Sequence, residues 1–225
     1  MKLSVIIPVY NEESTIGRVI DEVYAAMPQV EKEIIVVDDG STDRTTEVLE
    51  TRRTIVNIIH CSRVNFGKGA AIRIGLTYVT GDMIIIQDAD LELSPGEYSN
   101  IIGPILEGKA DVVYGSRFLK PNPGIPFRTR LANAVLTWLT NLLYGGNLSD
   151  METAYKAFRA GVIQGIPLEC HRFEFEPEVT AKILKAGHRI TEVPVSYCPR
   201  SVCEGKKIGW RDGWMAIRTL LKYRF

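Results

Sequence analysis

Cysteine and histidine are scarce in this sequence, and their spacing excludes several kinds of site. The 225 residues include four cysteines and three histidines. No two cysteines have the Cys-x-x-Cys spacing of a zinc or redox site, and the histidines are not clustered, which excludes a histidine-based metal site. No signal peptide opens the chain, so we expect reduced thiols in a cytoplasmic protein.

A net charge of one sign is also missing. Lys and Arg together number 27, as do Asp and Glu, so the formal net charge is zero and gives no reason to expect nucleic-acid binding. The apolar stretches fall short of the roughly 20 residues that a membrane-spanning helix needs, so we expect no span. The chain is nevertheless 45% hydrophobic, and its length predicts one large α/β domain over residues 1–225.

Two nucleotide-binding signatures are absent as well. The segment Gly67-Lys68-Gly69 lacks the third glycine of a dinucleotide-binding loop and the Gly-Lys-Ser/Thr of a P-loop. A dehydrogenase and a P-loop kinase are therefore excluded. By itself this segment is also typical of a simple turn that opens a helix.

Apolar runs alternate with helical patterns along the chain. Strands are expected at residues 3–8, 33–38, 55–60, 83–88, 112–114 and 154–158, with extended segments over 189–197. Helices are expected at about 11–27, 43–52, 70–79, after Ser94-Pro95, at 131–144 and at 176–186. The alternation, and strands that are apolar on both faces, predict an α/β fold with a mostly parallel, doubly wound sheet.

Two of these strands end in acidic pairs. Asp38-Asp39 closes one apolar run, and Asp88-Ala89-Asp90 closes another. Ligands bind at the carboxyl ends of strands in an open α/β sheet, and paired carboxylates suit a hard divalent cation that also holds phosphate oxygens. The pattern indicates one crevice for a metal–diphosphate ligand. Taken singly, each pair is also typical of a helix cap or a solvated strand end.

Four motifs, in this order, carry a family resemblance. They are SVIIPVYNE (4–12), VDDGSTD (37–43), NFGKG (65–69) and QDAD (87–90). Together they resemble glycosyltransferase family 2, the inverting GT-A enzymes, and within it the dolichyl- or polyprenyl-phosphate sugar synthases. The resemblance covers nearly the whole chain. It implies the GT-A nucleotide-diphospho-sugar transferase fold, a UDP- or GDP-sugar donor and a Mg²⁺ or Mn²⁺ cofactor.

The resemblance implies roles for matched residues of the nucleotide-sugar-binding half, 1–115. The implied donor set is Pro8, Tyr10, Glu12, Asp39, Lys68, Gln87, Asp88 and Asp90. The segment from Pro8 to Glu12 packs around the nucleobase and ribose, and Asp39 hydrogen-bonds the base. Asp88 and Asp90 are the implied metal-binding pair, in which the first faces the ribose and the second ligates the ion.

The acceptor half, 116–225, contains the arginines that the resemblance assigns to phosphate. Arg117 follows the fifth strand and Arg128 precedes an apolar helix. In the polyprenyl-phosphate enzymes such arginines bind the acceptor phosphate, which guanidinium forks match in geometry. Arg200 and Lys207 match the basic group that approaches the donor diphosphate. Surface charge is the alternative interpretation of these cations.

Asp150 and Glu152 fall where inverting GT-A enzymes often place a carboxylate near the acceptor. With a hydroxyl acceptor one of them acts as general base, and we favour Asp150. With an ionised phosphate acceptor, Asp150 orients the acceptor or the sugar, or only caps a helix. The acids of residues 171–178 (HRFEFEPE) either bind sugar hydroxyls or begin a helix. The run after Asp150 departs from that of dolichyl-phosphate mannose synthases, which leaves the sugar and acceptor open.

The end of the chain is basic. From 199 to 225 there are seven Lys or Arg and two acidic residues. Trp210, Trp214, Ile217 and Leu221 recur at helical spacing beside cations. Such a helix either lies in a bilayer interface, near a prenyl-lipid phosphate, or packs on the domain's own core.

The sequence therefore predicts an inverting, metal-dependent glycosyltransferase in which Asp90, Asp150 and Arg117 carry catalysis. The expected acceptor is polyprenyl (dolichyl or undecaprenyl) phosphate, and the expected location is the cytoplasm or the periphery of the cytoplasmic membrane face, with a membrane surface or separate membrane protein as partner. Two alternatives stay open: a soluble hydroxyl acceptor with Asp150 as base, and a non-catalytic sugar-nucleotide-binding module. A nucleotidyltransferase is disfavoured because residues 10–13 lack its glycine- and arginine-rich signature.

Overall fold

Seven strands form one sheet in the computed structural model, which describes residues 1–199 and 210–225. They are β1 (Leu3–Val9), β2 (Lys32–Asp38), β3 (Ile58–Cys61), β4 (Met83–Ile86), β5 (Val112–Ser116), β6 (Lys156–Arg159) and β7 (Ile190–Pro194). Their order in the sheet is β3-β2-β1-β4-β6-β5-β7. Neighbours are parallel except where β6 pairs with β4 and β5. The predicted mostly parallel sheet is confirmed.

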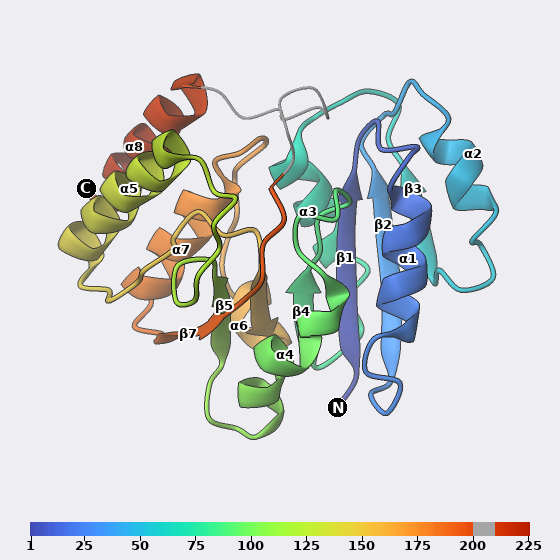
Figure 1. Cartoon of the computed structure of the whole chain (residues 1–225), viewed down its shortest axis with the longest axis horizontal. Helices are drawn as coiled ribbons and strands as arrows, with labels where there is room; N and C mark the ends of the chain where they lie inside the picture. The colour runs from blue at the N-terminus through green and yellow to red at the C-terminus, as the bar shows by residue number, and fades with distance from the viewer. Residues whose placement is uncertain (200–209) are drawn as a thin grey trace.

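Helices cover both faces of this sheet, as expected for a doubly wound fold (Figure 1). They are α1 (Ile16–Ala25), α2 (Thr45–Glu50), α3 (Lys68–Leu76), the 3₁₀ helix η1 (Pro95–Glu97), α4 (Tyr98–Leu106), α5 (Phe127–Tyr144), α6 (Ala160–Gln164), α7 (Phe175–Lys185) and α8 (Trp210–Arg224). One core cluster joins α1, α2 and α4 to the sheet, and a second joins α3, α6 and α7 to its other face.

Strand β1 shows why the central strands are apolar throughout. Val5 and Ile7 belong to the core cluster that contains α1, and Ile6 belongs to the cluster that contains α3. All three are 0% exposed. Successive side chains point to opposite faces, and both faces are covered, so each position has to be apolar. Burying one such side chain is worth about 1.5–3 kcal/mol.

Strand β6 reverses the chain direction in the middle of the sheet. It pairs antiparallel with β4 through Ile84 and Phe158, and with β5 through Val113 and Ala157. Because β6 runs opposite to its neighbours, the loop of residues 150–155 that leads into it lies at the edge where β4 and β5 end. Acceptor-half residues thereby reach the edge that carries the donor motifs.

Helices α5, α7 and α8 share a third cluster beside the sheet. Leu136, Ala181, Ala216 and Leu220 are buried in it, and the Tyr144 hydroxyl donates to the Leu220 carbonyl at 2.5 Å. Helix α8 thus packs on the protein's own core. None of the helices in the described ranges is long and apolar enough to span a bilayer.

The apolar stripe predicted on α8 lies largely away from this packed face. Trp214 is 66% exposed and Leu221 is 43% exposed, whereas Ile217 is packed against the third cluster. The side chain of Trp210 lies outside the described residues. The packed face of α8 therefore supports packing on the core, and its exposed apolar face supports contact with a bilayer interface.

Candidate active site

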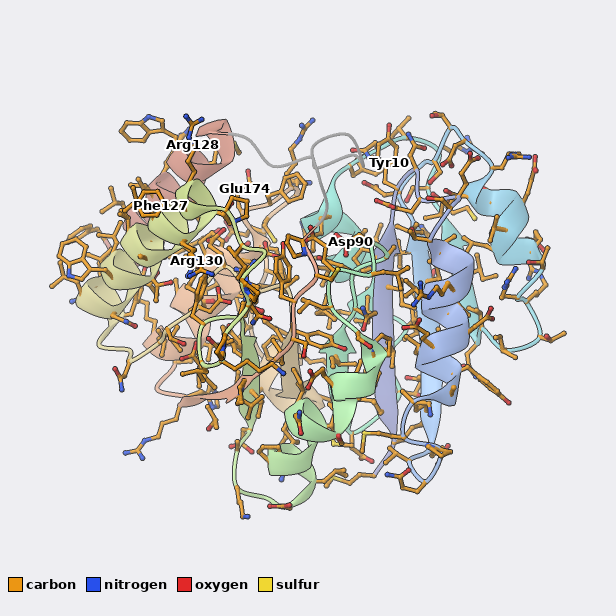
Figure 2. The ribbon with its side chains drawn as sticks, in the orientation of Figure 1. Tyr10, Asp90, Phe127, Arg128, Arg130 and Glu174 are labelled. Atoms are coloured by element: carbon orange, nitrogen blue, oxygen red, sulfur yellow. The ribbon has the colours of Figure 1, made fainter. Side chains whose placement is uncertain are left out.

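The carboxyl ends of β1, β2 and β4 bring the predicted donor residues to one edge of the sheet. Tyr10 follows β1, Asp39 follows β2, and Asp88 and Asp90 follow β4. Strand β1 lies between β2 and β4, so these residues converge although they are distant in sequence. Figure 2 shows Tyr10 and Asp90 beyond the strand ends, in the upper part of the view.

The loop after β1 holds the residues predicted to surround the nucleobase. Pro8 is buried within β1, whereas Tyr10 and Glu12 are partly exposed. The loop is fixed to the segment after β2, because the Asn11 N–H donates to Ser41 Oγ and the Glu12 N–H donates to Thr45 Oγ1, each at 2.9 Å. Tyr10 and Glu12 are therefore presented at the carboxyl edge, and Pro8 supports the strand.

Asp39 is a buried carboxylate that ties two loops together. It is 3% exposed, and its two oxygens accept hydrogen bonds from the backbone N–H groups of Phe66 at 2.9 Å and Gly67 at 2.6 Å. Burial raises the pKa of Asp39, although these two bonds act in the opposite direction. A base that hydrogen-bonds Asp39, as predicted, has to share the carboxylate with the turn at 65–67.

Asp38, the other member of the pair, serves its own turn. Its carboxylate accepts from the Ser41 N–H at 2.9 Å and from the Thr46 hydroxyl at 2.8 Å. Asp38 is 1% exposed. The turn-and-cap interpretation of this motif therefore applies to Asp38, while Asp39 is directed to the neighbouring loop.

The glycine-rich turn packs directly on the segment before α7. Gly67 has a φ of +103°, and a Cβ there would lie 2.5 Å from the His171 carbonyl oxygen, so the position requires glycine. The N–H groups of Gly69 and Ala70 donate to the carbonyls of Arg172 and His171 at 3.1 and 2.9 Å. Two of the first amides of α3 are thus engaged by backbone and are not open to an anion.

Lys68 forms a buried ion bridge between the two halves of the chain. Its Nζ lies 2.9 Å from Asp88 Oδ1 and 2.8 Å from Glu176 Oε1, and its side chain is 15% exposed. Burial acts to lower the pKa of Lys68, but the two carboxylates outweigh it and raise the pKa above its ordinary value. Lys68 therefore links the end of β4 to the first turn of α7.

Gln87 lies inside the protein. It is 0% exposed, and its Nε2 donates to the Leu93 carbonyl at 3.0 Å. Its Oε1 accepts from the Tyr98 and Tyr155 hydroxyls, each at 3.1 Å. The contact with the nucleotide sugar expected of Gln87 is therefore replaced by a supporting role, because its amide is already bonded and has no exposed surface. It holds the loop that carries Asp88 and Asp90.

Asp88 and Asp90 are partly exposed carboxylates at the end of β4. Asp88 faces Lys68, and Asp90 Oδ1 accepts from the Glu92 N–H at 3.1 Å. Across residues 1–199 and 210–225, no group of three or more His, Cys, Asp or Glu side chains is arranged to hold a metal. The pair nevertheless fits Mg²⁺ or Mn²⁺, since such ions are commonly held by one or two carboxylates together with substrate phosphates.

Arg117 and Asp150 form a buried bidentate ion pair. Arg117 Nε and Nη2 each lie 2.7 Å from an Asp150 oxygen, and the Arg117 N–H donates to Asp150 at 2.9 Å. Asp150 is 0% exposed and Arg117 is 9% exposed. Both carboxylate oxygens are engaged, so Asp150 is not placed as the general base that the sequence suggested. Arg117 can meet an acceptor phosphate only while it also holds Asp150.

Glu152 is the carboxylate of this loop that has an oxygen without a partner in the described part of the chain. Its Oε1 is buried and has no hydrogen-bond partner among the described residues. Burial, and next the charge of Glu176, raise the pKa of Glu152 to about 7, while Lys156 and Arg117 act in the opposite direction. The two carboxylates that the sequence offered as candidates thus differ in the fold, because Arg117 lies against Asp150 and one Glu152 oxygen has no partner among the described residues.

Two of the acids at the start of α7 are held by partners within the protein. Glu176 binds Lys68, and Glu178, which is 0% exposed, accepts the N–H groups of Glu169 and Cys170 at 2.8 and 2.7 Å. These two acids are structural. Glu174 is partly exposed, and in the view of Figure 2 it lies between α5 and Asp90.

The predicted phosphate-binding cations beyond Arg117 are placed unevenly. Arg128 is exposed in the first turn of α5 (Figure 2), with no ion pair to the described part of the chain. Another arginine of the same turn, Arg130, is tied locally, since its guanidinium donates to the Asn122 carbonyl at 2.8 Å. Arg200 and Lys207 lie outside the described residues.

A family model for glycosyl transferase family 2 matches residues 4–166. The chain belongs to glycosyl transferase family 2. The matched segment contains both acidic pairs, Lys68, Arg117 and the 150–155 loop. The predicted family and enzyme class, a glycosyltransferase, are confirmed.

Two relatives in this family match nearly the whole chain. The low-salt glycan biosynthesis hexosyltransferase Agl6 of Haloferax volcanii is 31% identical over 227 residues, which cover 97% of this chain and 53% of the relative. The undecaprenyl-phosphate 4-deoxy-4-formamido-L-arabinose transferase of Salmonella paratyphi A is 33% identical over 213 residues, which cover 91% of this chain and 62% of the relative. The chain thus spans between half and two thirds of the length of these relatives.

The fold is similar to that of glucosyl-3-phosphoglycerate synthase from Mycobacterium tuberculosis. Its crystal structure with Mn²⁺, UDP and phosphoglyceric acid gives a TM-score of 0.78 at 22% identity, covering 99% of this chain and 78% of that one. Its crystal structure with Mg²⁺ and UDP gives a TM-score of 0.75. At this identity the likeness establishes the GT-A fold and leaves the substrate open.

Proposed function

We propose that this family 2 enzyme is inverting and metal-dependent, and that it transfers a sugar from a UDP- or GDP-sugar to polyprenyl phosphate. The observation that carries the proposal is the convergence of Asp39, Asp88 and Asp90 at neighbouring strand ends. The Salmonella relative is named for undecaprenyl phosphate, which supports the acceptor. The structural neighbour was crystallised with UDP and Mn²⁺, which supports the donor and the ion.

The donor half binds and orients the nucleotide sugar. Tyr10 and Glu12 flank the nucleoside, and Asp39 accepts from the base. Asp88 and Asp90 are the residues that would hold Mg²⁺ or Mn²⁺, an ion whose charge stabilises a leaving diphosphate. Lys68 orients Asp88, since its ammonium lies within 3.0 Å of both Asp88 oxygens.

The acceptor half of the chain binds the acceptor, whose oxygen attacks the sugar. That oxygen forms a bond to the anomeric carbon on the face opposite the diphosphate, and the bond between this carbon and the diphosphate breaks with its electron pair on the leaving group. Arg128 is exposed and suited to an acceptor phosphate. Arg117 contacts the acceptor phosphate while it stays paired with Asp150. Roles for Arg200 and Lys207 at the diphosphate rest on the sequence.

An exposed apolar surface on α5 and α8 supports a lipid acceptor. We call it the α5–α8 surface; it comprises Phe127, Leu131, Val135, Trp138, Leu142, Trp214, Met215 and Leu221. Their exposed fractions range from 38% to 76%. On α5 they are spaced by three or four residues, so they lie along one side of the helix. Such a surface is larger than isolated apolar residues explain.

An anionic bilayer is the occupant that the charges favour. The described side chains of α5 and α8 include arginines and lysines but no acid, and Arg128 and Arg218 are exposed. Lys222 is already paired with Glu169 at 2.7 Å. A two-fold contact between copies of this chain would bring like charges together, whereas tryptophans flanked by cations suit a lipid interface. The free thiols of the described cysteines fit a reducing compartment, which supports the cytoplasmic face.

Vesicle binding tests this surface. Trp138→Ser combined with Leu131→Ser should weaken binding to vesicles that contain phosphatidylglycerol by at least about tenfold, given about 1.5–3 kcal/mol per large apolar side chain. The control is Tyr24→Ser on α1, where the replaced residue is 58% exposed. Equal binding of both variants would contradict the assignment, and a concentration-dependent dimer lost in the double variant would instead favour self-association.

Transfer of radiolabelled sugar from UDP- and GDP-sugars to polyprenyl phosphate, with and without Mn²⁺, tests the function itself. We expect a labelled lipid product that requires the ion, and Asp90→Ala should abolish it. Full activity of Asp90→Ala would refute the metal role. Tight donor binding without transfer or hydrolysis on any acceptor would identify a binding module instead.

A soluble hydroxyl acceptor is the second candidate. The observation that favours it is Glu152, an unpaired carboxylate of the kind that a hydroxyl needs for deprotonation. Both oxygens of Asp150 are engaged by Arg117. A panel of sugar and glycerate acceptors assayed beside polyprenyl phosphate separates the two candidates.

A further inference from the structure

Glu152 differs from several other acids of the acceptor half in having a buried oxygen without a hydrogen-bond partner in the part of the chain that the structure describes. Asp150 is paired with Arg117, Glu176 with Lys68, and Glu178 with Lys182, and Glu192 accepts the N–H groups of Ser149 and Asp150. In contrast, one Glu152 oxygen is buried and unbonded among the described residues. Such a group is costly to maintain, so its persistence indicates a use beyond folding.

The backbone around Glu152 is held firmly. The Glu152 N–H donates to Asn133 Oδ1 at 3.3 Å, and the preceding Met151 N–H donates to Thr137 Oγ1 at 3.0 Å, both on α5. The loop leads into antiparallel β6 and so lies at the edge where β4 and β5 end. Glu152 is therefore held at the sheet edge where β4 ends, by the same helix that bears the exposed apolar surface.

The charges that face Glu152 come from four directions. They are Glu176 of α7, Lys156 of β6, Arg117 after β5 and Asp150 of the same loop. Lys156 is the nearest cation in sequence, yet its ammonium donates to the Met151 carbonyl at 2.9 Å and to the Thr153 carbonyl, and lies 4.3 Å from the Tyr114 ring centroid. Arg117 is committed to Asp150. Neither cation forms an ion pair with Glu152.

We propose that Glu152 is the base that receives the proton of the acceptor oxygen. The inference rests on glycosyl transfer in this crevice and deepens it. The acceptor O–H bond breaks and its proton moves to a Glu152 oxygen. The electron pair of that bond forms the new bond to the anomeric carbon, and the pair of the broken carbon–diphosphate bond stays on the diphosphate.

This role holds for either class of acceptor. A hydroxyl needs a base at neutral pH. A phosphate monoester has a second pKa near 6, so only the fraction that is still protonated requires the base. The raised pKa of Glu152 is suited to accepting a proton near pH 7.

Glu152→Gln tests the proposal, with Glu47→Gln on the exposed surface of α2 as matched control. We expect Glu152→Gln to lower kcat by about 10²–10⁴-fold, the usual contribution of a general base, with donor KM unchanged. In the wild type, kcat/KM should fall at acid pH as Glu152 is protonated. In Glu152→Gln, only the part of this fall that comes from the acceptor's own ionisation should remain. Glu152→Asp should recover part of the activity. The thermal midpoint of Glu152→Gln should equal or exceed that of the wild type, because a carboxylate with a buried, unbonded oxygen is removed.

A Glu152→Gln enzyme with kcat within threefold of wild type would overturn the proposal, as would one with an unaltered acid limb. A lowered midpoint with a proportional loss of activity would assign Glu152 a structural role. If the wild type fails on polyprenyl phosphate, the proposed acceptor is wrong, and the same comparison is made with hydroxyl acceptors and with donor hydrolysis by water. Infrared difference spectra across neutral pH give a readout without turnover: the wild type should show a protonated-carboxyl band that Glu152→Gln lacks, and its absence from the wild type contradicts the proposal.

Discussion

Replacing Asp150 by Asn distinguishes a structural role from a catalytic one for this buried carboxylate. Asp150 is 0% exposed and accepts three hydrogen bonds from Arg117, two from the guanidinium and one from the backbone N–H. Asparagine keeps one acceptor oxygen but removes the charge, which leaves a guanidinium that is 9% exposed without its counter-ion. Breaking one side of a buried pair costs about 3–5 kcal/mol.

The size of the effect makes it easy to measure. At about 2–4 °C per kcal/mol for a chain of this length, the thermal midpoint of Asp150→Asn should fall by about 6–20 °C. Denaturant unfolding should show a free energy of unfolding that is lower by about the same 3–5 kcal/mol. Replacing both partners, with Met at 117 and Leu at 150, should restore most of this loss, since no uncompensated charge remains.

Activity decides between the two roles. If Asp150 is structural, turnover per folded molecule should fall modestly, through disorder of the loop that carries Glu152. A variant with an unchanged free energy of unfolding and a turnover reduced by several orders of magnitude would refute this reasoning. It would return the base role to Asp150 and remove it from Glu152.

Two further predictions concern stability. Gly67→Ala should lower the free energy of unfolding by about 1–3 kcal/mol in thermal or denaturant unfolding, because φ is +103° and the His171 oxygen would lie 2.5 Å from the new Cβ; Gly161→Ala, which meets nothing within 4 Å, is the control and should be neutral or stabilising. Glu33 should produce acid sensitivity. Burial acts to raise its pKa, but bonds from Lys2, Ser4 and Thr80 outweigh burial and lower the pKa from 4.5 to about 2. A depressed folded-state pKa gives stability that is present above the unfolded value and is lost as pH falls from 4.5 toward about 2. Urea unfolding across this range should lose up to about 3 kcal/mol in the wild type, and a Glu33→Gln variant with the same pH slope would contradict the assignment.

The parallel strands were predictable because both of their faces are buried. The expected strand at 83–88 corresponds to β4 at Met83–Ile86, and the one at 33–38 to β2 at Lys32–Asp38. Strand β6 was found near its place, but its direction was not, because Ala157 and Phe158 pack equally well whichever way the chain runs. The pairing with β4 and β5 decides it. The short helix α6 had no signal, since residues 160–164 are too few to show a helical period.

The site was predictable where its chemistry is local. Asp88 and Asp90 close an apolar run, so their place at a strand end followed from the sequence. The roles of Lys68 and Asp150 did not, because their partners are distant: Lys68 binds Glu176 across 108 positions, and Asp150 binds Arg117 across 33. Asp150 and Glu152 have the same functional group two residues apart, so burial and pairing alone distinguish them. Gln87 was misjudged for the same reason, since a motif gives no information on which way a side chain points.

The closed first turn of α3 has a consequence for how the donor binds. Gly69 and Ala70 give their amides to backbone carbonyls, and Lys68 is held by Asp88 and Glu176. Neither these two amides nor this lysine is left to balance the charge of a pyrophosphate. In the function proposed above, that countercharge comes from Arg200, Lys207 and the cation, so nucleotide and cation would bind in one linked equilibrium in which each strengthens the other by the same factor.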